Sequence, residues 1–137
     1  MDGAIPAPKG EMTMIGYVTI GTNDLAKAAK FYDALLAEIG GKRMMETEKF
    51  IAWDRGDGGA GLGVTKPFDG KKATVGNGVM VALMVDKPEK VDRVYKKALA
   101  LGAKDEGPAG PRGDSGFYAG YFRDLDGNKL NVFCMKK

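Results

Sequence analysis

The chain has 137 residues, 44% of them hydrophobic, which suits one domain with a sizeable core or two small fused halves. Its net charge is +3, with basic and acidic residues interspersed, and no apolar run approaches the ~20 residues that span a bilayer. We therefore expect neither a nucleic-acid partner nor a membrane partner. The single cysteine, Cys134, excludes an internal disulfide and favours a cytoplasmic location.

The first half of the chain predicts a strand, a helix and three further strands, in that order. Residues 1–11 carry two prolines and two glycines without periodicity, and are expected to be a flexible arm or a remnant that is not native. A strand is predicted at 14–21, and Asn23 or Asp24 caps a helix over about 25–39. Short strands are then expected at 42–47, 49–55 and 60–65, before a polar connection over 66–76.

The second half predicts the same order of elements. Residues 79–85 form a predicted strand, and Pro88 begins a helix over 88–101 that Gly102 ends. The remaining elements are a short strand near 103–106, a glycine- and proline-rich loop at 107–116, and strands at 117–123 and 129–135.

The two halves also match residue by residue. When Tyr17 is set on Met80, the residues that coincide include Tyr32 with Tyr95, Leu36 with Leu99 and Ala37 with Ala100. This internal repeat predicts two βαβββ modules rather than one irregular α+β arrangement. We expect a single domain over 12–137, with a first module at 12–66, a linker at 67–76 and a second module at 77–137.

Three stretches resemble one known family. They are GYVTIGTNDLAKAAKFYDALLAEIG in the first half, GNGVMVAL at the start of the second, and the closing segment YFRDLDGNKLNVF. Together they are similar to small members of the vicinal oxygen chelate superfamily, the glyoxalase/bleomycin resistance/dioxygenase proteins. The resemblance implies an α+β fold in which two βαβββ modules form a curved, eight-stranded mixed sheet around a cavity. It also implies a homodimer.

Catalytic members of this family hold a divalent metal with histidine and glutamate side chains. Carried over to this sequence, the four ligand positions are Tyr17, Gly63, Met80 and Asn131, and the chain contains no histidine. A phenol, a thioether, one amide oxygen and a bare backbone are a poor set for zinc, iron or nickel. We therefore expect no metal and no other cofactor.

The same resemblance and the alternation of side chains along strands extend the candidate ligand site. Tyr121, Arg123 and Phe133 are expected to face the cavity with Tyr17, Met80 and Asn131, while Phe122, Leu130 and Val132 face the helices. Two candidates keep open alternatives. Trp53 is either a core or dimer contact or a stacking wall of the pocket. Arg123 either binds a ligand anion or pairs with a neighbouring carboxylate.

The favoured function is a metal-independent small-molecule-binding protein, similar to the drug-sequestering members of the family, which holds a partly apolar organic ligand. The alternative is a divergent lyase or isomerase that uses Tyr17, Tyr121 or a carboxylate for acid–base chemistry. A module that serves only protein contacts is a third alternative. The sequence assigns no catalytic residue, and metal-dependent glyoxalase or dioxygenase activity is not expected.

Overall fold

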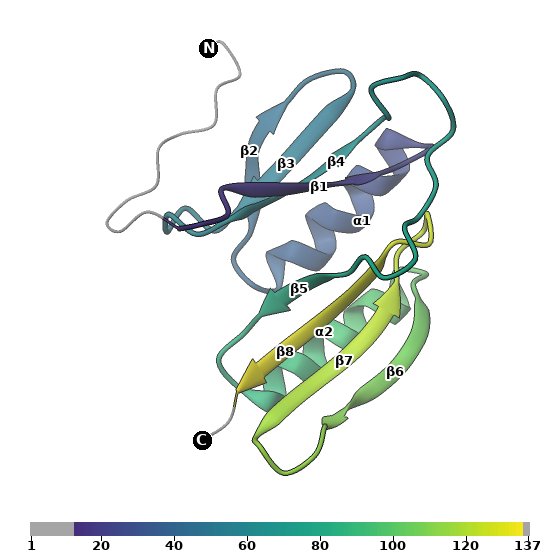
Figure 1. Ribbon diagram of the computed structural model, residues 1–137. Coiled ribbons are helices and arrows are strands. Elements are labelled where there is room, and N and C mark those ends of the chain that lie inside the picture. Colours follow the sequence, from purple (N-terminus) through teal and green to yellow (C-terminus); the bar gives the residue numbers. More distant parts are fainter. Residues whose placement is uncertain (1–12, 136–137) are drawn as a thin grey trace. The chain divides into compact units, whose positions relative to one another are not determined.

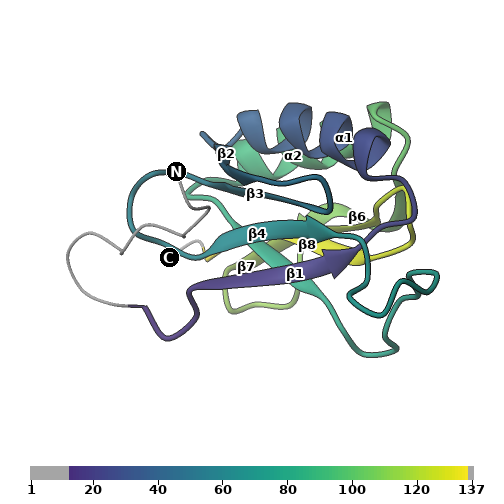
Figure 2. The same cartoon turned by 90° about the horizontal axis from the view of Figure 1, so that it is seen from above.

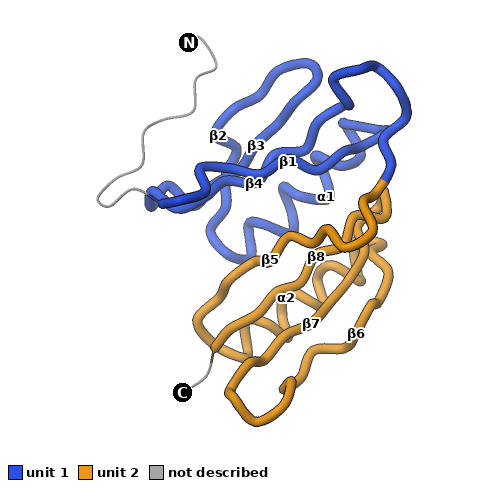
Figure 3. The backbone as a smooth tube through the Cα atoms, viewed as in Figure 1, with its two compact units in different colours: residues 1–74 blue, residues 75–137 orange. Residues whose placement is uncertain are grey.

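The computed structural model describes residues 13–135, which form eight strands and two helices (Figure 1). The predicted arm at 1–11 lies outside the described residues. The chain divides into two compact units, residues 1–74 and 75–137, and the boundary falls inside the predicted connection (Figure 3). We call them unit 1 and unit 2 and describe each by itself.

Unit 1 contains one helix and one four-stranded mixed sheet. The sheet order is β1-β4-β3-β2, in which β1 runs parallel to β4 and the other neighbours are antiparallel. Its elements are β1 (Tyr17–Gly21), α1 (Leu25–Ala37), β2 (Lys42–Glu46), β3 (Phe50–Asp54) and β4 (Gly61–Thr65).

Helix α1 begins where the sequence predicts. The Asp24 side chain accepts a hydrogen bond from the backbone N–H of Lys27, which satisfies one of the free donors at the helix start. The helix ends at Ala37, two residues earlier than predicted, because the last turn tightens into bonds between residues three apart, beginning with Glu38 N–H to the Leu35 carbonyl. Gly40, with φ at 81°, then turns the chain away.

Unit 2 repeats the architecture of unit 1. The sheet order is β5-β8-β7-β6, with β5 parallel to β8 and the other neighbours antiparallel. Its elements are β5 (Val81–Met84), α2 (Pro88–Ala100), β6 (Lys104–Pro111), β7 (Phe117–Arg123) and β8 (Lys129–Met135). The predicted α+β class and the two βαβββ modules are confirmed, with the eight strands divided between two four-stranded sheets.

One element of unit 2 differs from the prediction. Strand β6 continues to Pro111, through the first half of the segment that was expected to be a loop, so the loop shortens to residues 112–116. The pairing of β6 with β7 shifts register twice, on either side of Gly107, whose φ is 152°. These irregularities let a glycine- and proline-rich segment follow a regular partner strand.

Each helix lies along one face of the sheet in its own unit, as Figure 2 shows. The apolar core of each unit is formed between the helix and that face. In unit 2 it includes Phe122, Leu130, Val132 and Cys134, all at most 1% exposed. Among residues 13–135, neither helix is long and apolar enough to cross a membrane.

Candidate functional site

Each sheet has a second face, which points away from the helix of its unit, and we call it the helix-free face. On β8, Leu130, Val132 and Cys134 point into the core, so Asn131 and Phe133 between them point to the helix-free face. On β7, Tyr121 is paired directly with Asn131, so the two side chains share that face. Three candidate residues for the ligand site, Tyr121, Asn131 and Phe133, are therefore neighbours on the helix-free face of unit 2.

Asn131 is the most unusual polar residue on this face. Its side chain is buried, with the residue only 2% exposed. Among residues 13–135, its Oδ1 is the one buried side-chain oxygen or nitrogen that has no hydrogen-bond partner. Leaving such an acceptor unsatisfied costs about 1–3 kcal/mol, and buried polar atoms in folded proteins are nearly always paired. The geometry therefore presents an acceptor that lacks a donor.

Tyr121, next to Asn131, carries two cations on its ring. The Arg112 guanidinium carbon lies 5.4 Å from the ring centroid, and the Lys129 ammonium nitrogen lies 5.5 Å from it. Both distances allow a cation–π interaction. The Arg112 side chain is also fixed by hydrogen bonds to the carbonyls of Gly110 at 2.9 Å and Pro108 at 2.6 Å. Positive charge is thus held beside an aromatic ring on this face.

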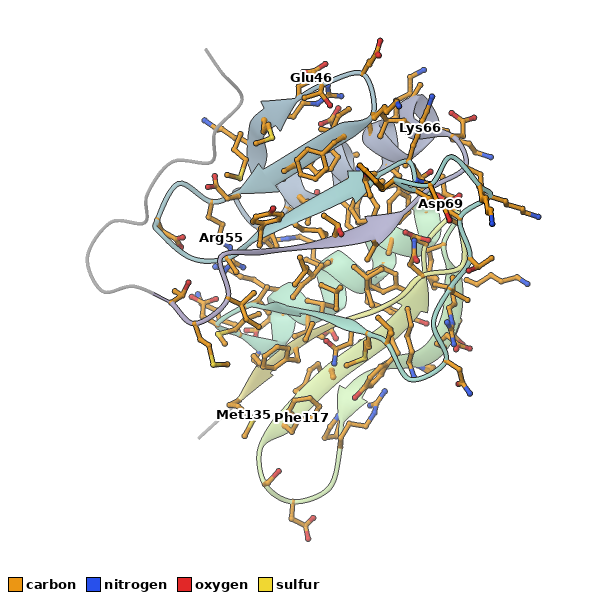
Figure 4. All side chains as sticks on the ribbon, turned by 45° about the horizontal axis from the view of Figure 1, so that its top comes forward. Glu46, Arg55, Lys66, Asp69, Phe117 and Met135 are labelled. Atoms are coloured by element: carbon orange, nitrogen blue, oxygen red, sulfur yellow. The ribbon has the colours of Figure 1, made fainter. Side chains whose placement is uncertain are left out.

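Neither cation was predicted from the sequence, for different reasons. Lys129 lies two residues before Asn131 on the same strand, so side-chain alternation could have found it. Arg112 follows β6 and reaches back to the ring of Tyr121, a contact that no local pattern signals. Phe117, also missed, stacks on Phe133 with ring centroids 5.5 Å apart. It lies beside Met135 at one end of the sheet (Figure 4).

Arg123 shares the face but its charge is already matched. Its Nε donates to Glu106 at 2.8 Å, and its Nη1 donates to the Gly127 carbonyl at 3.1 Å. Of the two alternatives for Arg123, the structure shows the ion pair with a neighbouring carboxylate. A ligand anion would have to compete with Glu106 for it.

The helix-free face of unit 1 holds Tyr17 and Gly63. Tyr17 on β1 is half exposed, and its ring meets that of Phe50 edge-on, with centroids 6.5 Å apart. Gly63 on β4 is buried and lies beneath the ring of Phe50. A Cβ atom added to Gly63 would lie only 2.8 Å from the Cζ atom of that ring, so no side chain fits there. Met80 lies just before β5 in unit 2 and is 40% exposed.

Trp53 faces the opposite side of the unit 1 sheet, against α1. It is 2% exposed, and its indole N–H donates to Asp33 on α1 at 2.9 Å. Asp33 also receives two hydrogen bonds from Arg43, and chiefly these hold the pKa of the Asp33 carboxyl below its usual value. Trp53 is therefore a core residue beneath the helix rather than a wall of the helix-free face, and we leave it out of the site.

The residues at the family's metal positions do not fit a metal ion. Asn131 offers one amide oxygen, Tyr17 a phenol and Met80 a thioether, and the space in front of Gly63 is filled by a phenyl ring. Within residues 13–135, no three His, Cys, Asp or Glu side chains gather into a group that could hold a metal.

Comparison with known proteins places the chain in a family. Residues 14–132 match the model of the Glyoxalase/Bleomycin resistance protein/Dioxygenase superfamily, and the chain belongs to that superfamily. The resemblance predicted from the sequence is thus confirmed. No curated protein sequence matches significantly.

Solved structures share the fold over nearly the whole chain. A glyoxalase/bleomycin resistance protein from Albidiferax ferrireducens T118 is 32% identical, with a TM-score of 0.82, and the match covers 90% of this chain and 100% of that one. The genomically encoded fosfomycin resistance protein FosX from Listeria monocytogenes is 17% identical, with a TM-score of 0.66 over 92% of this chain and 96% of its own. At that identity the second likeness shows the fold alone.

Proposed function

We propose that this protein binds a small, partly apolar organic ligand without a metal, on the helix-free face of unit 2. The observation that carries the proposal is the buried, unpartnered Oδ1 of Asn131. A ligand that displaces the atoms covering this oxygen and brings a hydroxyl, amide or ammonium donor to it removes the cost of the unsatisfied acceptor, and this gain contributes to binding.

The surroundings of Asn131 define the rest of the ligand. Tyr121 and Phe133 flank it with aromatic rings, which suits an apolar or aromatic body. Arg112 and Lys129 beside Tyr121 attract an anionic substituent. The proposed ligand therefore combines a hydrogen-bond donor, an apolar body and a negative or strongly polar edge.

Binding without turnover is favoured over the lyase or isomerase alternative. General acid–base catalysis needs a group whose pKa lies near the working pH. In unit 2, the hydrogen bond to Asp92 is the main cause that raises the pKa of Tyr118, and burial is the main cause that raises the pKa of Tyr95. Both phenols lie on the helix side of the unit 2 sheet, and both shifts move them away from neutrality, so neither is suited to acid–base work. The carboxylate of Glu106 is tied to Arg123.

Two further features belong to the proposal. One is a homodimer, because small members of the family commonly form dimers. The other is a cytoplasmic location, which suits a chain whose single cysteine has a buried thiol.

The test is a thermal-shift screen of metabolites and antibiotics in the presence of a chelator, with hits measured by calorimetry and by product analysis. Asn131→Leu removes the acceptor at similar volume. We expect the ligand-free variant to melt at the same or a higher temperature than the wild type, since an unsatisfied buried group is gone, and to bind hits at least about tenfold more weakly.

Two controls locate the site and separate the functions. Tyr121→Ala should also weaken binding, whereas Met135→Ala, at the exposed end of β8, should not. Hits bound equally well by Asn131→Leu and Tyr121→Ala would show that the site lies elsewhere. Consumption of a hit by the wild type, lost in Tyr121→Ala, would favour the enzyme.

A further inference from the structure

Unit 1 contains a second recess, away from the residues discussed so far. It lies where β1 and β4 end and β3 begins, and it has a volume of about 320 Å³. Four of its eight lining residues are lysines and none is acidic. They are Thr22, Asn23, Lys49, Lys66, Pro67, Gly70, Lys71 and Lys72, and we call this recess the lysine pocket.

The backbone walls of the lysine pocket are held by hydrogen bonds. The Asn23 side-chain amide binds the loop after β4 through two hydrogen bonds to Ala73. Its Oδ1 accepts from the Ala73 N–H at 2.7 Å, and its Nδ2 donates to the Ala73 carbonyl at 3.2 Å. Gly21 lets this loop approach, because a Cβ there would lie 3.0 Å from that of Ala73. The Lys66 N–H donates to the Lys49 carbonyl at 2.9 Å and joins the two strands that carry these lysines.

The turn that carries Lys71 and Lys72 is fixed as well. The Gly70 N–H donates to the Pro67 carbonyl at 3.0 Å, and the Asp69 carboxylate accepts from Lys71 N–H at 2.9 Å. In Figure 4, Lys66 and Asp69 project from the same end of unit 1. The pocket is therefore a formed recess, whose shape does not wait for a ligand.

The four lysine side chains of the pocket form no ion pair with the described residues 13–135. Within the part of the chain that the structure describes, none of the four ammonium groups lies within 4.0 Å of a carboxylate. The carboxylate nearest in sequence to three of them, Asp69, accepts a hydrogen bond from the Lys71 N–H, and its single charge offsets only part of theirs. Four like charges around one recess repel one another, and a bound anion would relieve that repulsion.

We propose that the lysine pocket binds a soluble ligand that carries two linked phosphate groups. A phosphate group has a charge of about −1.5 to −2 near pH 7, so two of them match four ammonium groups. Lysines act as point charges on phosphate rather than as planar forks, which fits recognition of charge density. The volume lies at the lower end of the range of about 300–1,000 Å³ for small-molecule sites. A concave recess can enclose a soluble ligand, whereas it fits a flat lipid surface poorly.

The proposal is tested on the full chain by calorimetric titration with inorganic pyrophosphate and, separately, inorganic phosphate, near 0.15 M ionic strength. The variant is Lys49→Gln with Lys66→Gln, and a second pair is Lys71→Gln with Lys72→Gln. These side chains are exposed, so the variants should fold, and circular dichroism checks this. We expect pyrophosphate to bind at least about tenfold more tightly than phosphate, and each pair to weaken it at least about tenfold.

A matched control carries the same change in net charge. Lys30→Gln with Lys96→Gln alters two exposed helix lysines outside the pocket and should leave the affinity within about twofold. An equal loss in this control would show that only overall charge matters and would overturn the proposal. The absence of pyrophosphate binding at millimolar concentration would also overturn the proposal. The same holds if the wild type binds only to phosphatidylcholine vesicles that contain a phosphoinositide bisphosphate, and not to pyrophosphate.

Discussion

The phenyl ring of Phe50 lies across the backbone of Gly63, in the space that a side chain at position 63 would need. The φ angle of Gly63 is not in the left-handed region, so glycine is required here for room and not for backbone conformation. The ring of Phe50 also meets Tyr17. Gly63, which the resemblance aligns with a metal-binding glutamate of the family, is thus covered by an aromatic contact in this chain.

A double-mutant cycle tests this relationship. Gly63→Ala should destabilise the protein by about 1–3 kcal/mol in urea denaturation, because the Cβ forces Phe50 to move. In a Phe50→Ala background the same change should be neutral, or stabilising by about 0.5–1 kcal/mol, since alanine is better than glycine in a strand. Gly16→Ala, where a Cβ meets nothing within 4 Å, is the control. Equal costs of Gly63→Ala in both backgrounds would refute the steric account.

Local signals in the sequence were sufficient for most of the fold. Asp24 and Pro88 mark both helix starts correctly, because capping and proline act within a few residues. Alternation along β7 and β8 gives the correct face for Phe122 and Leu130. Strand β6 beyond Gly107 was missed, because it has no alternating pattern and its conformation depends on pairing with β7.

The site was less predictable, because its features depend on burial and long-range contact. The sequence identifies Asn131 as a candidate, but only the folded chain shows that its oxygen is buried without a partner. The lysine pocket joins Lys49 to Lys66, Lys71 and Lys72 through a strand pairing and a turn, and no segment of the sequence contains that cluster.

The Asp33 carboxylate accepts hydrogen bonds from both the buried Trp53 and the partly exposed Arg43, so its removal should lower the stability of the fold. Asp33→Ala leaves the indole N–H of Trp53 buried without an acceptor, so we expect a loss of about 1–3 kcal/mol in the free energy of unfolding. Asp33→Asn keeps an acceptor oxygen and loses only the charge that meets Arg43, a partly exposed pair worth about 0–1 kcal/mol. Glu48→Ala, an exposed carboxylate elsewhere in unit 1, is the control. Equal effects of Asp33→Ala and Asp33→Asn would contradict the role assigned to the indole bond.

The charge of Asp33 also predicts a pH dependence. Hydrogen bonds from Arg43 are the main cause that lowers its pKa in the folded protein below 3.8. A lowered pKa stabilises the fold above the unfolded value, about 3.9, and this contribution disappears as the pH falls through the folded pKa. The difference in unfolding free energy between wild type and Asp33→Asn should therefore be constant from pH 7 to about 5 and shrink toward zero below it. Urea titrations at several pH values measure it, and a gap that widens on acidification would be the wrong sign.

The donor set predicts that the purified protein holds no stoichiometric transition metal. Tyr17, Met80 and Asn131 offer no imidazole or carboxylate, and Phe50 covers Gly63. Elemental analysis should find well under one zinc, nickel or iron per chain, and adding these ions should leave the melting temperature unchanged, since an ion that does not bind the folded state cannot stabilise it. About one metal per chain that is lost in Asn131→Leu would show that the family-type centre survives.

The last prediction concerns assembly. Strand β5 is an edge strand of its sheet, with Met84 60% exposed on it and Met80 40% exposed just before it. Exposed edges with apolar side chains favour pairing with another chain, and two-fold dimers are the commonest outcome. We therefore expect sedimentation at micromolar concentration to give twice the 14.6 kDa mass of the chain. Met84→Lys should shift the equilibrium toward the monomer, because a charge on the edge opposes pairing, whereas Met135→Lys, at the exposed end of β8, should not. A wild type that sediments only as a monomer would exclude the dimer, and a dimer equally stable in Met84→Lys would place its interface away from β5.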